Sequence, residues 1–285
     1  MTYSYIDSDR LLIGFRQKLH KNNIKAICMD FEGEFNLHCY GEKLCLIQVF
    51  DGRAFYVIDP FHISKTELKK TLESNVIKLF YSAGSDRKLV FNQYGIRIKS
   101  LLDIADLAAV IDPRHGGLSS IIEEVLSVNV EKKKNYQKHN WTLRPVAEDA
   151  IQYALSDVRY LFELKDALLK KIQENDLVEA LAYRLAKAEF DYEKKNEPGV
   201  KKKTRYSKFN QKEQSVFDIV FRIREKFAQN VNKPPNSVLD NEQVFQIAEN
   251  RLDIADARFG KAVPIPVRKK MIQEISAALP AATAE

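Results

Sequence analysis

The chain has 285 residues, which is long enough to bury a sizeable core and leaves room for two domains. Hydrophobic residues make up 45% of it and charged residues 29%, as is ordinary for a soluble globular protein. No apolar run approaches the ~18 residues of a transmembrane helix, which excludes a membrane-spanning class.

The cysteines and the first residues of the chain indicate the cellular compartment in which the protein is expected. Cys28, Cys39 and Cys45 lack Cys-x-x-Cys spacing, which is typical of reduced thiols and argues against a structural zinc. Residues 1–7 show no basic region followed by an apolar one, so no signal peptide is visible. We therefore expect a cytoplasmic protein with no membrane partner.

The net charge of +6 is concentrated in one short segment. Residues 194–208 hold seven basic residues against one acid, whereas residues 1–193 and 209–285 are close to neutral. This segment includes Lys201, Lys202, Lys203 and Arg205. It is either a solvated linker or an arm that binds nucleic-acid phosphates, and the sequence leaves both readings open.

The first ~190 residues alternate between strand and helix patterns. In chain order they predict a helix over 8–21, strands over 24–31, 44–50 and 54–58, a helix over 66–72, a strand over 76–81, and helices over 85–94, 101–111, 117–126 and 146–174. Asp51-Gly52 signals a hairpin, and Gly95 ends a helix. This order predicts an α/β domain with a mixed sheet over residues 1–192.

The rest of the chain predicts a different architecture. Residues 193–209 contain Pro198-Gly199 and the lysine runs, which is typical of a basic linker. Residues 210–280 show only helical patterns, broken at Pro234-Pro235. We therefore expect a small all-helical bundle over 210–280.

Asp30 and Glu32 are the first candidate site residues. They lie two apart at the end of the strand predicted over 24–31, so both side chains point to the same face. Carboxylates at the end of a buried strand are costly unless they are paired or bind a metal. The alternative is a strand end that simply leaves the core for water. Glu34 would add an acid to this face if the strand continues that far.

Three further candidates lie on two of the predicted helices. Asp86 begins the helix after the strand over 76–81, where an acid is also favourable as a cap. Tyr153 and Asp157 lie four apart in a helix and share a face. Asp103 is either a helix cap or a support for the other acids. Carboxylates from separate elements that meet at one point repel each other, and divalent cations are the usual reason for such a cluster.

Several stretches together match one known pattern. The first motif is Met29-Asp30-Phe31-Glu32, the second is Phe80-Tyr81-Ser82-Ala83-Gly84-Ser85-Asp86 followed by Leu89-Val90-Phe91, and the third is Tyr153-Ala154-Leu155-Ser156-Asp157-Val158. Further matching stretches are Leu46-Ile47-Gln48-Val49, Ile58-Asp59-Pro60, Leu102-Asp103 and Trp141 through Pro145. Residues 1–190 thus resemble the ribonuclease D branch, with the tyrosine-containing third motif, of the DEDD superfamily of 3′→5′ exonucleases. Residues 210–280 resemble the helicase-and-RNase-D C-terminal (HRDC) module.

The resemblance implies a ribonuclease H-like fold and a two-metal 3′→5′ exoribonuclease that releases nucleoside 5′-monophosphates. Two Mg²⁺ or Mn²⁺ ions would lie ~4 Å apart. Asp30 would bridge them, with Glu32 and Asp157 on one ion and Asp86 on the other. Tyr153 would orient the attacking water.

The resemblance also implies partners. The substrate would be a single-stranded 3′ end, in tRNA or other structured RNA processing. Phe31 or Leu89 would stack against the terminal bases, and Lys201, Lys202, Lys203 and Arg205 would contact phosphates. Two alternatives remain, a 3′→5′ DNA exonuclease in repair and a non-catalytic RNA-binding adaptor. The oligomeric state, the physiological RNA and the choice of metal stay open.

Overall fold

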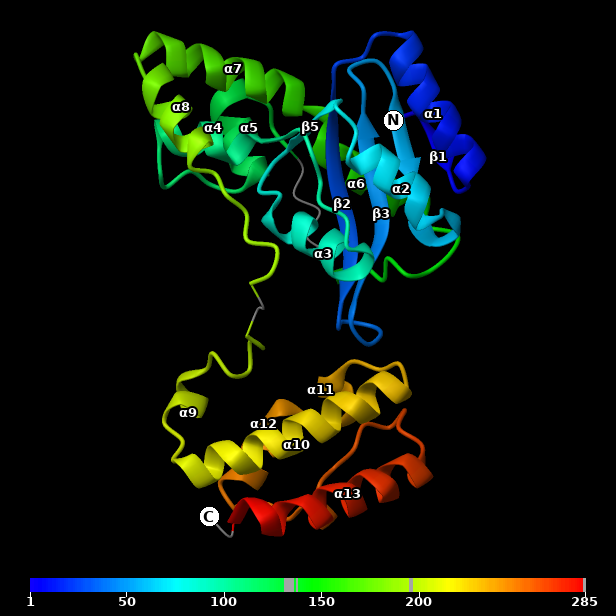
Figure 1. Cartoon of the computed structure of the whole chain (residues 1–285), viewed down its shortest axis with the longest axis vertical. Coiled ribbons are helices and arrows are strands. Elements are labelled where there is room, and N and C mark those ends of the chain that lie inside the picture. The colour runs from blue at the N-terminus through cyan, green and yellow to red at the C-terminus, as the bar shows by residue number, and fades with distance from the viewer. Residues whose placement is uncertain (131–135, 137, 195–196, 284–285) are drawn as a thin grey trace. The chain divides into compact units, whose positions relative to one another are not determined.

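The structure is a computed structural model that describes residues 1–130, 136, 138–194 and 197–283 (Figure 1). It consists of two compact units, of which the first comprises residues 1–34 and 42–192 and the second comprises residues 35–41 and 193–285. The main division along the chain therefore falls between Tyr192 and Glu193.

Within the described residues, the first unit centres on a six-stranded sheet with the order β1-β4-β3-β2-β5-β6. The strands are β1 (Tyr3–Ile6), β2 (Ala26–Phe35), β3 (Glu42–Phe50), β4 (Phe55–Ile58), β5 (Ile77–Phe80) and β6 (Leu101–Asp103). β3 and β4 are antiparallel, β1 runs parallel to β4, and β5 runs parallel to β2 and β6. The predicted α/β class with a mixed sheet is confirmed.

Helices contribute to a core on each face of this sheet (Figure 1). On one face they are α1 (Asp9–Lys21), α2 (Lys65–Leu72) and α3 (Gly84–Tyr94). On the other face they are α4 (Ile104–Ile111), α5 (Leu118–Leu126), α6 (Glu148–Arg159) and α7 (Leu161–Glu174). A short turn of 3-10 helix, η1 (Pro60–His62), follows β4, and α8 (Val178–Ala186) follows α7.

The alternation of side chains along β2 decides which residues face which core. Ile27, Met29 and Phe31 are buried with α1, α2 and α3, whereas Cys28 is buried with α4 to α7. Because successive side chains of a strand point to opposite faces, the even-numbered positions that follow Cys28 belong to the second face. This parity places Asp30 on the α6 side of the sheet.

Local signals fix several helix boundaries. The Ser64 hydroxyl accepts a hydrogen bond from the Glu67 backbone N–H and caps α2. Gly95, with φ of +64°, ends α3 in the left-handed conformation, as predicted. The Asp103 carboxylate caps α4 by accepting from the Ala105 N–H.

Several elements differ from the sequence predictions, among them α8, which lies beyond the last helix predicted for this domain. β1 was not predicted, because four residues are too few to show a period. β6 was predicted as the start of the helix over 101–111, but it pairs with β5 over three residues and the helix begins at Ile104. The long helix predicted over 146–174 is broken at Tyr160, and the apolar period hides this break because Val158 and Leu161 enter the same core.

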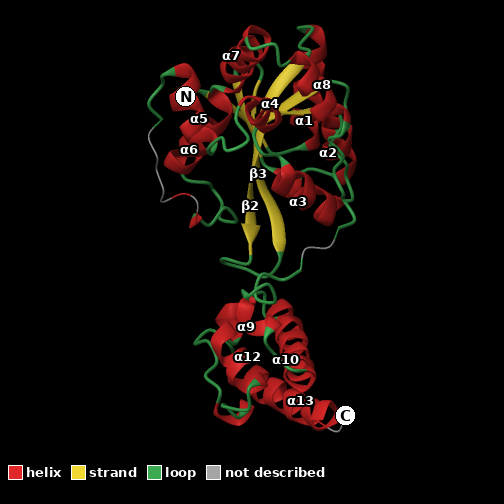
Figure 2. Ribbon diagram, turned by 90° about the vertical axis from the view of Figure 1, so that its left-hand side faces the viewer, coloured by secondary structure: helices red, strands yellow, loops and turns green. Residues whose placement is uncertain are grey.

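Between residues 197 and 283, the secondary structure of the second unit is helical apart from a bridge between Leu239 and Phe259 (Figure 2). Its elements are α9 (Thr204–Ser207), α10 (Gln211–Asn230), α11 (Pro235–Val238), α12 (Asn241–Ala248), the 3-10 turn η3 (Ile254–Asp256) and α13 (Ile265–Thr283). Asn210 and Glu213 form a capping box at the start of α10. The predicted helical bundle is present, while its HRDC assignment stays a prediction.

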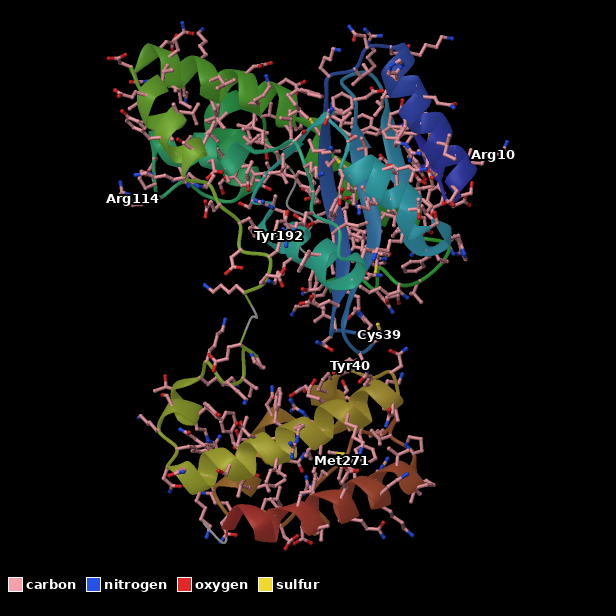
Figure 3. All side chains as sticks on the ribbon, in the orientation of Figure 1. Arg10, Cys39, Tyr40, Arg114, Tyr192 and Met271 are labelled. Atoms are coloured by element: carbon pink, nitrogen blue, oxygen red, sulfur yellow. The ribbon has the colours of Figure 1, made fainter. Side chains whose placement is uncertain are left out.

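The core of this unit reaches into the segment predicted as a linker. Val200 and Phe209 are buried in the same cluster as Phe217 and Met271, the last of which is labelled in Figure 3. Residues 195 and 196 of the predicted linker lie outside the described residues. The part of the predicted linker from Val200 onwards therefore packs as part of the helical unit.

Among the described residues, no helix has the length and apolar character needed to cross a membrane.

Candidate active site

Three carboxylates from two elements meet on the α6 face of the sheet. Asp30 and Glu32 lie on β2, and Asp157 lies on α6, which packs against β3 and β4. One carboxylate oxygen of each lies within 4.8 Å of the others. β2 continues to Phe35 and buries Glu34, but Glu34 does not belong to this group of three. The strand and helix spacings found in the sequence therefore bring distant acids together.

Tyr153 precedes Asp157 by one turn of α6. Its ring stacks on that of Tyr136, with centroids 5.2 Å apart and an angle of 27° between the planes. The Ser156 hydroxyl donates a hydrogen bond to the Tyr153 carbonyl oxygen. Burial raises the pKa of the Tyr153 phenol, and the charges of Asp157, Glu32 and Asp30 raise it further.

Asp86 reaches the site from the turn after β5. It lies in the first turn of α3, and its side chain is buried. Ser82 in this turn has φ of +61°, an unfavourable conformation for a residue with a side chain. The Asp103 carboxylate accepts hydrogen bonds from the Ser82 N–H at 2.7 Å and the Ala83 N–H at 2.8 Å. These bonds hold the turn in place and thereby position Asp86.

The last residues of the first unit also pack against α3. Tyr192, labelled beside α3 in Figure 3, accepts a hydrogen bond at its hydroxyl from Arg87 Nε at 3.2 Å. The Tyr192 ring lies 5.0 Å from that of Phe91, and the Arg87 guanidinium lies 4.1 Å from the Phe190 ring. Together these contacts fix the helix that carries Asp86.

The cluster is electrostatically strained as it stands. Burial raises the pKa of Asp30 well above its ordinary value, and the charges of Asp86, Asp157 and Glu32 raise it further. Burial raises the pKa of Asp157 to about 7. Burial, and then the charge of Asp103, raises the pKa of Asp86 to about 7. Burial, and then the charges of Asp157 and Asp86, raise the pKa of Glu32 as well. Four acids with raised pKa values need a positive charge to be ionised together near neutral pH.

The residues fit a divalent cation. Carboxylate oxygens are the ligands that Mg²⁺ and Mn²⁺ prefer. The 4.8 Å limit on the spacing of the three oxygens is slightly wider than the ~4.2 Å between opposite ligands of Mg²⁺, which binds oxygens at ~2.1 Å. Small rotations of these side chains would suffice for the three oxygens to bind a single ion. Asp86 lies outside the tight group but close enough to raise the pKa of Asp30 and Glu32.

Comparison with known protein families gives the decisive observation. The profile of a family described as 3′-5′ exonuclease matches residues 3–173. The chain belongs to the 3′-5′ exonuclease family. The matched residues contain all five candidate groups, Asp30, Glu32, Asp86, Tyr153 and Asp157.

Curated relatives of this 3′-5′ exonuclease family member include ribonuclease D of Escherichia coli, which is 33% identical over 172 residues. That match covers 59% of this chain and 44% of the relative. The human exosome complex component 10 is 23% identical over 241 residues, which is 78% of this chain and 27% of that protein. The chain therefore spans less than half the length of these curated relatives.

Solved structures show the same fold. The catalytic core of RRP6 from Trypanosoma brucei has a TM-score of 0.73 at 20% identity, covering 98% of this chain and 80% of that one. Escherichia coli RNase D has a TM-score of 0.71 at 21% identity, covering 98% of this chain and 75% of that one.

The assignment of Phe31 and Leu89 to base stacking needs correction. Both side chains are buried in the core with α1 and α2, and the Phe31 ring packs edge-on against Phe80 at 5.2 Å. Phe31 lies between Asp30 and Glu32 in sequence, so the alternation of β2 turns it away from the acids. Neither side chain offers a surface on which a base can stack.

The basic residues predicted to bind phosphates lie in the second unit, and two of them have acidic partners there. Lys201 Nζ lies 2.7 Å from the Asp218 carboxylate, and Arg205 binds Glu242 and Glu249 at the same distance. Lys202 and Lys203 are exposed. The interaction of these four residues with nucleic acid stays a prediction.

Sequence reasoning gave no role to two further side chains of the first unit. Tyr136 stacks on Tyr153, and no spacing connects it to the motifs. Gln48 is fully buried on β3, and its side-chain oxygen and nitrogen have no hydrogen-bond partner within the described residues. The signal for Gln48 was its place in the matching stretch Leu46–Val49, where a polar residue interrupts an apolar strand.

Proposed function

We propose that this protein is a metal-dependent 3′→5′ exoribonuclease that releases nucleoside 5′-monophosphates from single-stranded 3′ ends, in the processing of tRNA or other structured RNA. The convergence of Asp30, Glu32 and Asp157 to within 4.8 Å carries this proposal. Family membership and the ribonuclease D and exosome relatives support it.

In this proposal the acids hold the cations and the tyrosine acts on the water. Asp30, Glu32 and Asp157 would hold one divalent cation, and Asp30 with Asp86 would hold a second. When bound, the cations would neutralise the phosphate and lower the pKa of a water molecule to make it a nucleophile. The Tyr153 hydroxyl lies one turn from Asp157 on the same helix and would orient the attacking water. The chain forms no covalent intermediate, so positioning and charge neutralisation are its main contributions.

The test is hydrolysis of a 5′-labelled single-stranded RNA and the matching DNA, with Mg²⁺, Mn²⁺ or EDTA. We expect a ladder that shortens from the 3′ end with either ion, that is abolished by EDTA, and that forms faster on RNA. A faster reaction on DNA would support a DNA exonuclease instead. Binding without hydrolysis under all conditions would support the adaptor.

Substitutions test the assignment of the site. Asp30→Asn and Asp157→Asn should each lower the rate by ~10³-fold while RNA binding remains, since metal charge stabilisation contributes several kcal/mol. Tyr153→Phe should cost less, ~10²-fold, because every carboxylate remains. Asp149→Asn is the matched control, since Asp149 is exposed on the same helix. Wild-type rates in Asp30→Asn or Asp157→Asn would show that the site lies elsewhere.

A further inference from the structure

Gln48 is a buried amide with no protein partner, and its position is unusual. Its side chain is 0% exposed, in the middle of β3, and both Nε2 and Oε1 lack a hydrogen-bond partner within the described residues. A buried polar group without a partner is costly, and an apolar residue of the same size would avoid the cost. Such a group in a folded protein calls for a partner that the protein chain does not itself supply.

The alternation of β3 places this amide on the face of the acid cluster. Its neighbours Ile47 and Val49 are buried with Met29, on the α1 face of the sheet. Gln48 therefore points to the opposite face, which is the face of Cys28 and Asp30. β3 lies next to β2 in the sheet, so the amide and the acids of β2 belong to neighbouring strands.

The packing of α6 on the sheet shows which part of this helix lies over Gln48. On this face, Leu46 belongs to the core with Ala154 and Leu155 of α6. Two residues after Gln48, Phe50 packs against the core that contains Val158. Gln48 thus lies beneath the stretch of α6 from 154 to 158, which is the stretch that carries Asp157. The amide is enclosed between the strand of Asp30 and the helix of Asp157.

We propose that Gln48 is a positioning residue for the metal ligands. Its Nε2 donates a hydrogen bond to a carboxylate oxygen of Asp30 or Asp157 when these residues turn towards a bound divalent cation. The bond holds that carboxylate in one orientation, as partners behind metal ligands commonly do. This inference rests on the proposed metal-dependent function.

The chemistry of an amide suits this task. A lysine at this position would bring a cation that competes with the metal, and an acid would add to the repulsion within the cluster. An amide supplies a donor without charge, and its oxygen can accept from a water of the site. The competing explanation is that a buried water pairs the amide and that Gln48 serves only the fold.

The test compares Gln48→Met with Leu46→Met. Methionine has nearly the shape of glutamine without its polar atoms, and Leu46 is fully buried on the same strand and face. Mn²⁺ binding to the full chain would be measured by calorimetry, and the urea midpoint would be measured in EDTA. The kcat and KM for RNA hydrolysis would be measured in parallel.

We expect Gln48→Met to weaken Mn²⁺ binding ~10–100-fold, equivalent to ~1.4–2.7 kcal/mol, without lowering the urea midpoint in EDTA. Saturating Mn²⁺ should restore much of kcat, and KM for RNA should stay unchanged. Leu46→Met should bind Mn²⁺ as the wild type does.

Two results would overturn the inference. Wild-type Mn²⁺ affinity in Gln48→Met would show that the amide does not act on the ligands. A lower urea midpoint in EDTA would show that the amide serves the fold. Failure of the proposed function looks different, because the wild-type protein itself would then neither bind Mn²⁺ nor hydrolyse RNA.

Discussion

Replacing Asp103 by asparagine tests how the turn before α3 is held. Asp103 Oδ1 accepts from the N–H groups of Ser82 and Ala105, and Oδ2 accepts from that of Ala83. Asparagine keeps one oxygen, so in either orientation an NH₂ group faces at least one of these donors. The turn then loses a bond at the point where Ser82 holds φ of +61°.

The expected loss of stability follows from these three bonds. A hydrogen bond to a charged group contributes ~1.5–3 kcal/mol, against ~0.5–1.5 kcal/mol for a neutral pair. One bond is lost and two become neutral, which sums to ~3.5–6 kcal/mol for buried bonds. The Ser82 bond is exposed and the other two are only partly buried, so we halve this sum and expect Asp103→Asn to lower the free energy of unfolding by about 2–3 kcal/mol. Because Asp86 follows this turn, its displacement by ~1 Å should also slow hydrolysis by up to ~10²-fold.

Trp141 makes the measurement specific to the first unit. It is the single tryptophan of the chain and is buried beside α6, so its fluorescence during urea unfolding reports on this unit. Asp112→Asn is the control, because Asp112 lies at the other end of α4 and its side chain is half-exposed. Its carboxylate accepts a hydrogen bond from a single backbone N–H, that of Arg114. It should change stability by less than ~0.5 kcal/mol. An Asp103→Asn protein as stable and as active as this control would refute the argument.

Two further predictions concern lysines. Lys202 and Lys203 are exposed and have no acidic partner within the described residues. Changing both to glutamine should reduce the slope of log affinity for single-stranded RNA against log salt concentration by up to ~1.4. Lys201→Gln, which breaks a pair with Asp218, should change this slope less. Burial lowers the pKa of Lys78 to about 8, against an ordinary ~10.4 in the unfolded chain. Between these values only the unfolded chain binds the proton, so stability should rise from pH 8 to 10 by up to ~3 kcal/mol, and urea midpoints should show that Lys78→Met abolishes this rise. An unchanged salt slope, or the same rise in Lys78→Met, would contradict the respective prediction.

The spacing of apolar residues along each strand and helix predicted most of the fold of the first unit. The alternation of β2 and the four-residue spacing on α6 are properties of single elements, so Asp30 with Glu32, and Tyr153 with Asp157, could be paired from sequence. The elements that failed depend on partners elsewhere in the chain. β6 has three residues, and only its pairing with β5 distinguishes Leu101–Asp103 from the first turn of a helix.

Phe31 shows the limit of reasoning from a motif. The family resemblance implied that Phe31 stacks on substrate bases, but the same alternation that brings Asp30 and Glu32 together sends Phe31 into the opposite core. Lys201 and Arg205 show the same limit for charge. The count of charged residues indicated a basic segment, whereas in the structure Lys201 and Arg205 form ion pairs with acids that are distant in sequence.

The residues hardest to find from sequence are those that we propose support the acids of the candidate site. A ligand must be an acid, and its neighbours on a strand or helix follow a fixed spacing. A supporting residue needs only a hydrogen-bonding group at the right point in space. Asp103 acts from β6, the strand beside β5, and Gln48 lies on β3, the strand beside β2, with a side chain that carries no charge. Burial separates such residues from ordinary polar ones, because a buried amide is costly unless a hydrogen-bond partner offsets its loss of hydration. Gln48 is therefore where the structure adds most to the sequence, and Gln48→Met, stable but weak in Mn²⁺ binding, is the outcome that would establish this.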